Sequence, residues 1–357
     1  MPNQFLTLKD ITAADHLGDP SSVGIVDNIV NVAPELDKIL GRPIAGISYE
    51  ALILTALGSN AGFRKINSGV PLSAPSLDLK RFNCFPFDCQ MSIEQALLIN
   101  RWDGGRGDSP AYLFTIHATS AARQKALKIG RQFYLGSLND PNGPAGLMDF
   151  LFTQRTQVDS RTGLKIDQVI DCGGTIAGHC ETIWFVKVGP QDVCWLFGNG
   201  KGIIQMPWLP QYTASADSTA AAPLRNLSWN SNLFGYIGTS FANYHAIGAL
   251  INVDVVNGTV APVNGVGGNG LWNDTVCADL YSKWPITESA TVAICTKKAA
   301  AMLQKTRAVT NFVSGPGREF TTGIAPLGEF PTKLPTFNGI PLIVTDSIVP
   351  GNQVVLN

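Results

Sequence analysis

The longest regular pattern of apolar and polar residues runs from residue 109 to residue 136 and predicts one helix of about 26 residues. Its apolar stripe recurs at helical spacing and consists of Ala118, Ala122, Ala126, Ile129 and Phe133. Ser109 can cap the start, Pro110 suits the first helical position, and Gly136 ends the helix. The resulting rod of about 40 Å is longer than most helices. We predict a spine against which sheets from both sides of the sequence pack, with an ordinary long core helix as the alternative.

Two runs rich in β-branched and aromatic residues, at residues 46–55 and 76–85, predict a long antiparallel ribbon. The tip between them, at residues 58–75, is rich in glycine and proline. A two-stranded ribbon is only marginally stable alone in water, so it must lean on another surface. We therefore expect the ribbon to project from its own subunit and to take most of its contacts from another chain.

Shorter patterns complete the organisation of the chain. They predict short helices at residues 23–32, 35–40 and 91–107, and further helices at 272–284 and 296–306. Strands are expected at residues 181–188, 193–197, 246–256 and 290–295, with turns at 172–178 and 198–202 and loops at 257–270 and 311–335. A final strand at residues 337–350 carries Pro341 near its start, which favours an edge or strand-initial position. We expect residues 337–349 to return to the spine helix and to pair in the sheet beside the base of the ribbon.

Composition favours a protein that associates with itself. Hydrophobic residues make up 45% of the 357 residues and charged residues only 15%, against a typical charged share of about 25%. A net charge of −1 argues against a general nucleic-acid binder. Seven scattered cysteines without a CxxC pair indicate reduced thiols in an intracellular setting. No signal peptide or membrane-spanning stretch is recognisable, so we expect synthesis in a cytoplasm.

The search for catalytic chemistry gives only weak patterns. Residues 265–270 match G-x-G-x-x-G by letter but lack the surrounding βαβ unit, and the Arg-Gly-Asp triplet at 106–108 reads as a helix-entry turn. A zinc site from His179, Cys180, Cys172 and Cys194 is conceivable, although the spacing matches no usual zinc pattern. Arg123, Lys128 and Arg131 give the spine helix a basic face that either meets phosphate or is simply solvated. We predict no catalytic, cofactor-binding or metal-binding residue and no enzyme activity.

The order of these parts resembles the HK-ninety-seven (Johnson) fold of tailed-bacteriophage major capsid proteins. Short sequence segments are also similar to that family: Ala-Pro-Glu-Leu at 33–36, Arg-Pro-Ile-Ala-Gly-Ile-Ser-Tyr at 42–49, Gly-Phe-Arg at 62–64 and Asn-Ser-Gly-Val at 67–70. Gly-Arg-Gln-Phe-Tyr at 130–134, Asp-Cys-Gly-Gly-Thr at 171–175 and Ile-Trp-Phe-Val-Lys at 183–187 continue the likeness. The ending Phe-Asn-Gly-Ile-Pro-Leu-Ile-Val-Thr-Asp at 337–346 is the most familiar piece.

The resemblance implies an α+β capsid fold in five parts. These are an N-terminal arm (1–41), an extended β-ribbon loop (42–90), a peripheral domain with the spine helix (91–145), an axial domain with a β-rich insert at about 172–252 (146–335), and a strand returning to the peripheral domain (336–357). It also implies a location in the virion head after assembly in the cytoplasm of a bacterial host, with no membrane.

The resemblance further implies a structural function. Copies of the chain would form hexamers and pentamers that close into an icosahedral shell around double-stranded DNA, which they contact non-specifically. A separate scaffolding protein and a portal are implied partners, and the sequence leaves decoration proteins open. Two alternatives remain: an encapsulin-type compartment shell, and an enzyme that binds a nucleotide at residues 265–270.

Overall fold

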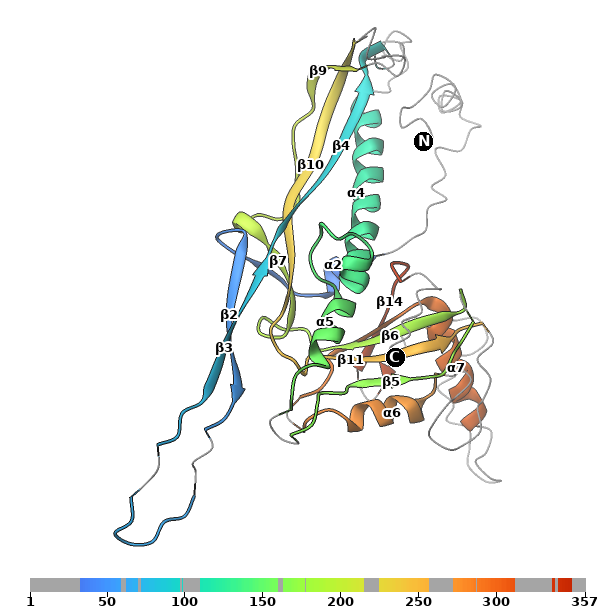
Figure 1. Cartoon of the computed structure of the whole chain (residues 1–357). Helices are drawn as coiled ribbons and strands as arrows, with labels where there is room; N and C mark the ends of the chain where they lie inside the picture. Colours follow the sequence, from blue (N-terminus) through green and yellow to red (C-terminus); the bar gives the residue numbers. More distant parts are fainter. Residues whose placement is uncertain are drawn as a thin grey trace.

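The computed structural model describes residues 33–58, 62–69, 72–96, 98, 110–159, 163–176, 178–214, 225–256, 272–286, 288–311, 336–337 and 340–348. Figure 1 shows an elongated molecule in which a long helix and a tall sheet form one body. A second sheet with two helices forms the other body, and a two-stranded ribbon projects away from both. The expectations for residues 23–32, 103–108, 257–270 and 312–335 lie outside the described residues.

The predicted spine helix is confirmed as α4 (Pro110–Leu135). It packs along β4 (Phe85–Glu94) and β10 (Arg225–Phe241), two strands that run side by side over ten paired residues. The expected helix at residues 91–107 is wrong over its first four residues, which belong to β4. Met91 and Ile93 face the spine helix and alternate with polar residues, so this segment follows the period of a strand.

The buried side of the spine helix differs from the predicted stripe in its first half. Ile129 and Phe133 are buried as expected, but Ala122 is exposed, and Ala121 and Lys125 occupy the buried positions. The Lys125 ammonium donates to the backbone oxygens of Phe87, at 3.2 Å, and of Leu233. A lysine can therefore lie at a core position here because its stem is apolar and its charged end reaches carbonyl groups of the sheet.

The first sheet has six strands, and β10 is its centre. Neighbouring strands follow the order β1 (Gly41–Pro43), β7 (Val193–Phe197), β10 and β4. The short strands β8 (Ile204–Gln205) and β9 (Leu209–Ala214) also pair with β10. The sequence predicted β7 correctly but missed β10, which has 17 residues. Segments before and after the spine helix therefore meet in one sheet, as the spine prediction required.

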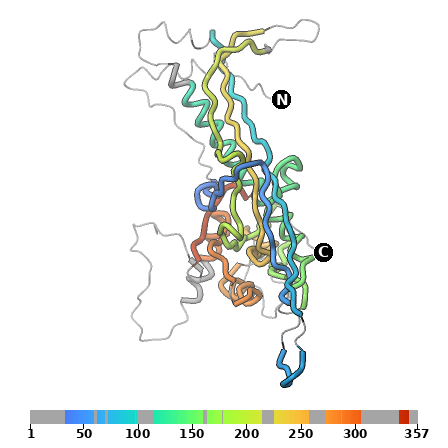
Figure 2. Tube along the Cα trace, turned by 90° about the vertical axis from the view of Figure 1, so that its left-hand side faces the viewer, coloured from blue at the N-terminus to red at the C-terminus, as the bar shows by residue number. Residues whose placement is uncertain are grey.

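The predicted ribbon is confirmed as β2 (Ser48–Ala56) and β3 (Ser76–Asn83), paired antiparallel from Ser48 and Asn83 outward. These two strands form a sheet of their own. Figures 1 and 2 both show the ribbon leaving the body at the level of the first sheet and extending well beyond it. The ribbon base is anchored within its own chain, because Ala51 and Phe82 belong to the main core.

The second sheet has six strands in the order β13 (Thr336–Phe337), β14 (Ile340–Val344), β12 (Val292–Cys295), β6 (Cys180–Val186), β11 (Ile247–Asp254), β5 (Val169–Asp171). One face packs against α6 (Asp274–Ser282) and α7 (Lys297–Asn311), and the other against α5 (Leu147–Gln154) and the spine. Every residue of β6 is consequently buried, as expected for a strand covered on both faces. The predicted strands and helices of this region are confirmed.

The expected pairing of the last strand is wrong. β14 lies parallel to β12 in the second sheet rather than in the sheet beside the ribbon. Coverage of both faces of this sheet explains the continuous apolar run, since Leu342 packs into one core and Ile343 into the other. The residues that follow do return to the spine: a Cβ on Gly130 of α4 would lie 2.3 Å from the Ser347 hydroxyl, so only glycine permits this approach.

The end of the chain, the spine and the N-terminal segment meet at Glu35, in the short helix α2 (Glu35–Lys38). Its side chain is 1% exposed. Tyr134 of the spine donates to one carboxyl oxygen at 2.7 Å, Thr345 donates to the same oxygen, and Ser347 donates to the other at 3.4 Å. The indole nitrogen of Trp195 in β7 donates to the Glu35 backbone oxygen at 3.1 Å. One residue thus joins four segments that are distant in sequence.

We predict that Glu35→Leu lowers the free energy of unfolding by about 3 kcal/mol, because three buried hydroxyls lose their acceptor. Denaturant unfolding of the purified subunit measures this loss. Asp37→Asn is the matched control, since Asp37 lies in the same helix with its side chain 78% exposed. Equal stability of Glu35→Leu and the wild type would contradict a structural role for this cluster.

Candidate assembly surfaces

The outer face of the ribbon carries an exposed ladder of leucines. In the strand register Leu52 lies opposite Leu79, and Leu54 lies opposite Leu77, so all four side chains project from one face. They are 53–65% exposed. The opposite face carries Ala51 and Phe82 into the core. A ribbon with one anchored face and one exposed apolar face is typical of a surface that another chain covers.

The tip of the ribbon adds further exposed apolar side chains beside positive charge. Phe63, Ile66 and Leu72 are more than 90% exposed. Arg64 and Lys65 lie between the first two, and both are exposed. Burying a large apolar side chain of this kind lowers the free energy by about 1.5–3 kcal/mol. The tip is therefore a second candidate contact.

The solvent side of the spine helix is basic. The helix contains four lysines and arginines and no acidic residue. Arg123, Lys128 and Arg131 are exposed, as predicted for the face opposite the stripe. Lys128 has one ion pair, 3.5 Å from Asp140, and both side chains are partly exposed, so this pair contributes little stability. Lys125 faces the other way, and burial lowers the pKa of its ammonium.

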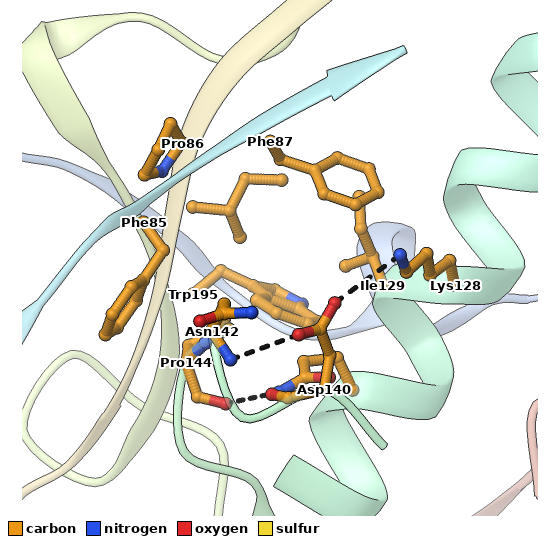
Figure 3. A pocket seen from close by; sticks show the side chains of 12 residues that line it. Phe85, Pro86, Phe87, Lys128, Ile129, Asp140, Asn142, Pro144 and Trp195 are labelled. Atoms are coloured by element: carbon orange, nitrogen blue, oxygen red, sulfur yellow. Dashed lines mark hydrogen bonds and ion pairs between the residues drawn. The ribbon is translucent and has the colours of Figure 1, made fainter. Parts of the chain in front are cut away.

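A small apolar pocket lies between β4, the spine helix and residues 140–144 (Figure 3). Its volume is about 110 Å³. The lining is mostly apolar, and Lys128 and Asp140, which form an ion pair, also belong to it. The apolar lining residues are Phe85, Pro86, Phe87, Ile129, Pro144, Trp195 and Ile237. Cofactor and substrate pockets are usually about 300–1,000 Å³. The space suits a single apolar side chain rather than a cofactor.

A buried carboxyl lies where the second sheet meets the spine. Glu181 of β6 is 2% exposed, and Thr296 donates to one of its oxygens. Its other oxygen has no partner among the described residues. Glu181 also borders a cavity of about 20 Å³ shared with Tyr134 and Ser347, which is enough for one water molecule. Burial raises the pKa of Glu181, an effect that the Thr296 hydroxyl and Lys298 oppose.

The residues considered for metal chemistry do not form a site. Cys172, Cys180 and Cys194 lie in different strands or turns, and within the described part of the chain no three His, Cys, Asp or Glu side chains come together. No disulfide joins any two of the seven cysteines, all of which are described. Burial raises the pKa of Cys84 to about 11 and of Cys172 to about 12, so neither thiol is activated. Among the described helices none is long and apolar enough to cross a membrane.

Comparison with solved structures identifies the fold. The alignment with a structure of bacteriophage Epsilon15 covers 100% of this chain and 99% of the Epsilon15 chain, with a TM-score of 0.67 and 14% sequence identity. The capsid of bacteriophage JBD30 covers 80% of this chain and 88% of its own (TM-score 0.44, 8% identity). An encapsulin complex from Synechococcus elongatus covers 72% of this chain and all of its own (TM-score 0.40, 10% identity).

No protein-family model and no curated protein matches the sequence. At these identities the comparisons establish the architecture, and the argument depends on the full-length Epsilon15 match. The chain has the α+β HK-ninety-seven fold, which confirms the fold that the sequence resemblance implied.

We predict that Glu181 makes stability fall as pH rises. Since its pKa is higher in the folded state, the folded protein holds this proton more tightly. The stabilisation is complete below the ordinary Glu pKa of 4.5 and is lost as pH rises through the raised value. Relative to Glu181→Gln, which cannot titrate, the wild type should therefore lose stability over this range. Denaturant unfolding of both proteins at several pH values measures the difference, and a constant difference would refute the assignment.

Proposed function

We propose that this chain is the major capsid protein of a tailed bacteriophage, which assembles as hexamers and pentamers into an icosahedral head around double-stranded DNA. The observation that carries the proposal is the similarity to the Epsilon15 structure, which extends over the whole of this chain and 99% of the other. In this proposal residues 42–90 with the ribbon are the extended loop, residues 91–145 with the spine helix form the peripheral domain, residues 146–335 form the axial domain, and residues 336–357 return toward the spine helix. The protein catalyses no reaction and holds no metal or cofactor.

The proposed assembly depends on the exposed face of the ribbon. When a neighbouring copy covers Leu52, Leu54, Leu77 and Leu79, each buried leucine contributes about 1.5–3 kcal/mol before ordering costs. The ribbon of one copy meets a different surface of the next, so the contact is heterologous and closes into rings when the rotation allows. The low share of charged residues in the sequence, 15%, supports repeated association of this kind.

The proposed partners follow from the same arrangement. The basic face of the spine helix is the candidate surface for packaged DNA, since phosphate contacts need cations but no base readout. A separate scaffolding protein and a portal complete the head, which forms in the cytoplasm of the bacterial host. An encapsulin-type shell is the alternative, and the contents of the shell distinguish the two: packaged genomic DNA or a cargo protein.

Electron microscopy of the purified protein, expressed with and without candidate scaffolding proteins from its own genome, tests the proposal. We expect closed icosahedral shells with hexameric and pentameric units. Only monomers or small oligomers under all these conditions would contradict it.

We predict that Leu79→Asp prevents shell formation and leaves the subunit folded. The substitution places a charge in the middle of the leucine ladder, where a neighbour would have to bury it. Leu209→Asp is the matched control, because Leu209 is 52% exposed and lies on β9, at the end of the first sheet opposite the ribbon (Figure 1). Sedimentation and circular dichroism separate assembly from folding. Normal shells from Leu79→Asp would exclude this face from the contact.

We also predict that the double variant Arg123→Glu, Arg131→Glu weakens binding of a DNA duplex at least tenfold at low salt. The double variant Arg64→Glu, Lys65→Glu makes the same change in net charge at the ribbon tip and should bind nearly as the wild type does. Fluorescence anisotropy of a labelled duplex across a salt series gives both affinities. An equal loss in the two variants would mean that only net charge matters.

A further inference from the structure

Besides the apolar anchors Ala51 and Phe82, a lysine whose charged end lies among aromatic rings holds the ribbon to the body. Lys80 is on β3, on the same face as Phe82, and points away from the leucine ladder. Its ammonium lies 4.7 Å from the ring centre of Phe150, 5.0 Å from that of Tyr244 and 5.4 Å from that of Phe82. It also donates to the backbone oxygen of Phe241 at 3.4 Å. These distances are those of cation–π interactions.

The rings around Lys80 belong to rigid parts of the body. Phe150 is in α5, and Phe241 ends β10; their rings stack with centres 5.2 Å apart. Tyr244 lies in the turn between β10 and β11 and stacks on Phe150 with an angle of 6°. Phe150 and Phe241 are 3% and 2% exposed. The site that receives the Lys80 ammonium is therefore fixed by three elements packed into the core.

Lys80 marks the place where the ribbon leaves the body. Counted from the tip, Ser76–Leu79 are all exposed, Lys80 is half-buried, and Phe82 is buried. A groove of about 590 Å³ runs along β2 from Tyr49 to Thr55, between the ribbon and the body. No packed apolar core therefore fixes the ribbon beyond Lys80, and a small rotation at its base would open or close this groove.

The charge of Lys80 is poorly hydrated in this position. Burial lowers the pKa of its ammonium, and the nearby Asp78 only partly offsets the effect. Burial and Asp78 together raise the pKa of the Tyr244 hydroxyl. A cation that has given up water depends on its ring and carbonyl contacts. Swinging the ribbon outward would break the contacts with Phe150, Tyr244 and the Phe241 oxygen together, whereas Phe82 lies on β3 and would move with the lysine.

We infer that Lys80 is a positioning residue that sets the angle at which the ribbon leaves the subunit, by locking its ammonium among Phe82, Phe150, Tyr244 and the Phe241 carbonyl. This inference rests on the proposed function for its consequence, because a neighbour can cover the leucine ladder only if the ribbon points toward it. The lock itself is a property of the single subunit and can be tested without assembly.

Three variants test the lock. Lys80→Met keeps the length and apolar stem of the side chain but removes the charge, Lys80→Arg keeps a cation that binds aromatic faces, and Lys65→Met removes a charge from the exposed tip. Amide hydrogen exchange of the unassembled Leu79→Asp subunit, used as the common background, reports opening of β2 and β3. We expect at least tenfold faster exchange there with Lys80→Met, and near-background rates with Lys80→Arg and Lys65→Met. Exchange in β6 and β11 should stay unchanged.

Unchanged exchange of the ribbon in Lys80→Met would overturn the inference. If that variant does not fold, Tyr244→Leu removes one ring of the lock instead and must accelerate the same amides. In the otherwise wild-type chain, Lys80→Met should give fewer closed shells and more open or irregular particles, with rescue by Lys80→Arg. Absence of shells from the wild type would count against the proposed function and leave the exchange result standing.

Discussion

The packing of the two bodies depends on the hydrogen bonds that the buried Glu35 carboxyl accepts. It accepts hydrogen bonds from Tyr134 of the spine and from Thr345 and Ser347 near the end of the chain, and its backbone binds Trp195 of the first sheet. Polar groups this deeply buried are costly unless each finds a partner. The Glu35 carboxyl and its three hydroxyl donors must therefore become buried together. This requirement fixes the positions of the N-terminal segment, the spine and the segment after the last strand relative to one another.

Two large hydrophobic cores and two small ones lie among the described residues. The main core joins the spine, the first sheet and one face of the second sheet, whereas the other core lies between the second sheet and helices α6 and α7. The ribbon shares only its base with the main core. Both sheets of the body thus pack against hydrophobic cores, whereas the ribbon beyond its base packs against none. An isolated pair of strands is only marginally stable, so in the proposed assembly a neighbouring copy completes this ribbon.

Sequence reasoning succeeded where a pattern was local and strong. The spine helix, the ribbon and β7 were predicted almost to the residue, because caps, glycines and apolar runs mark their ends. β10 was missed because serine and asparagine occupy much of it, and a strand of this kind is recognisable only beside β4. Lys125 and Lys80 were missed for a related reason: their interactions are with carbonyls and rings more than 35 residues away. The leucine ladder needs the register of both strands, which the sequence alone leaves open.

The geometry of a projecting ribbon explains why its base must be held firmly. Nine residues of extended strand span about 30 Å, so a tilt of about 10° at the base moves the outer end by about 5 Å. That displacement is about the spacing between neighbouring strands, enough to take each leucine from its intended contact to the next one. Apolar contacts are not directional and cannot correct such an error by themselves. The direction has to come from contacts with defined geometry at the base, and a cation among fixed rings and a carbonyl supplies it.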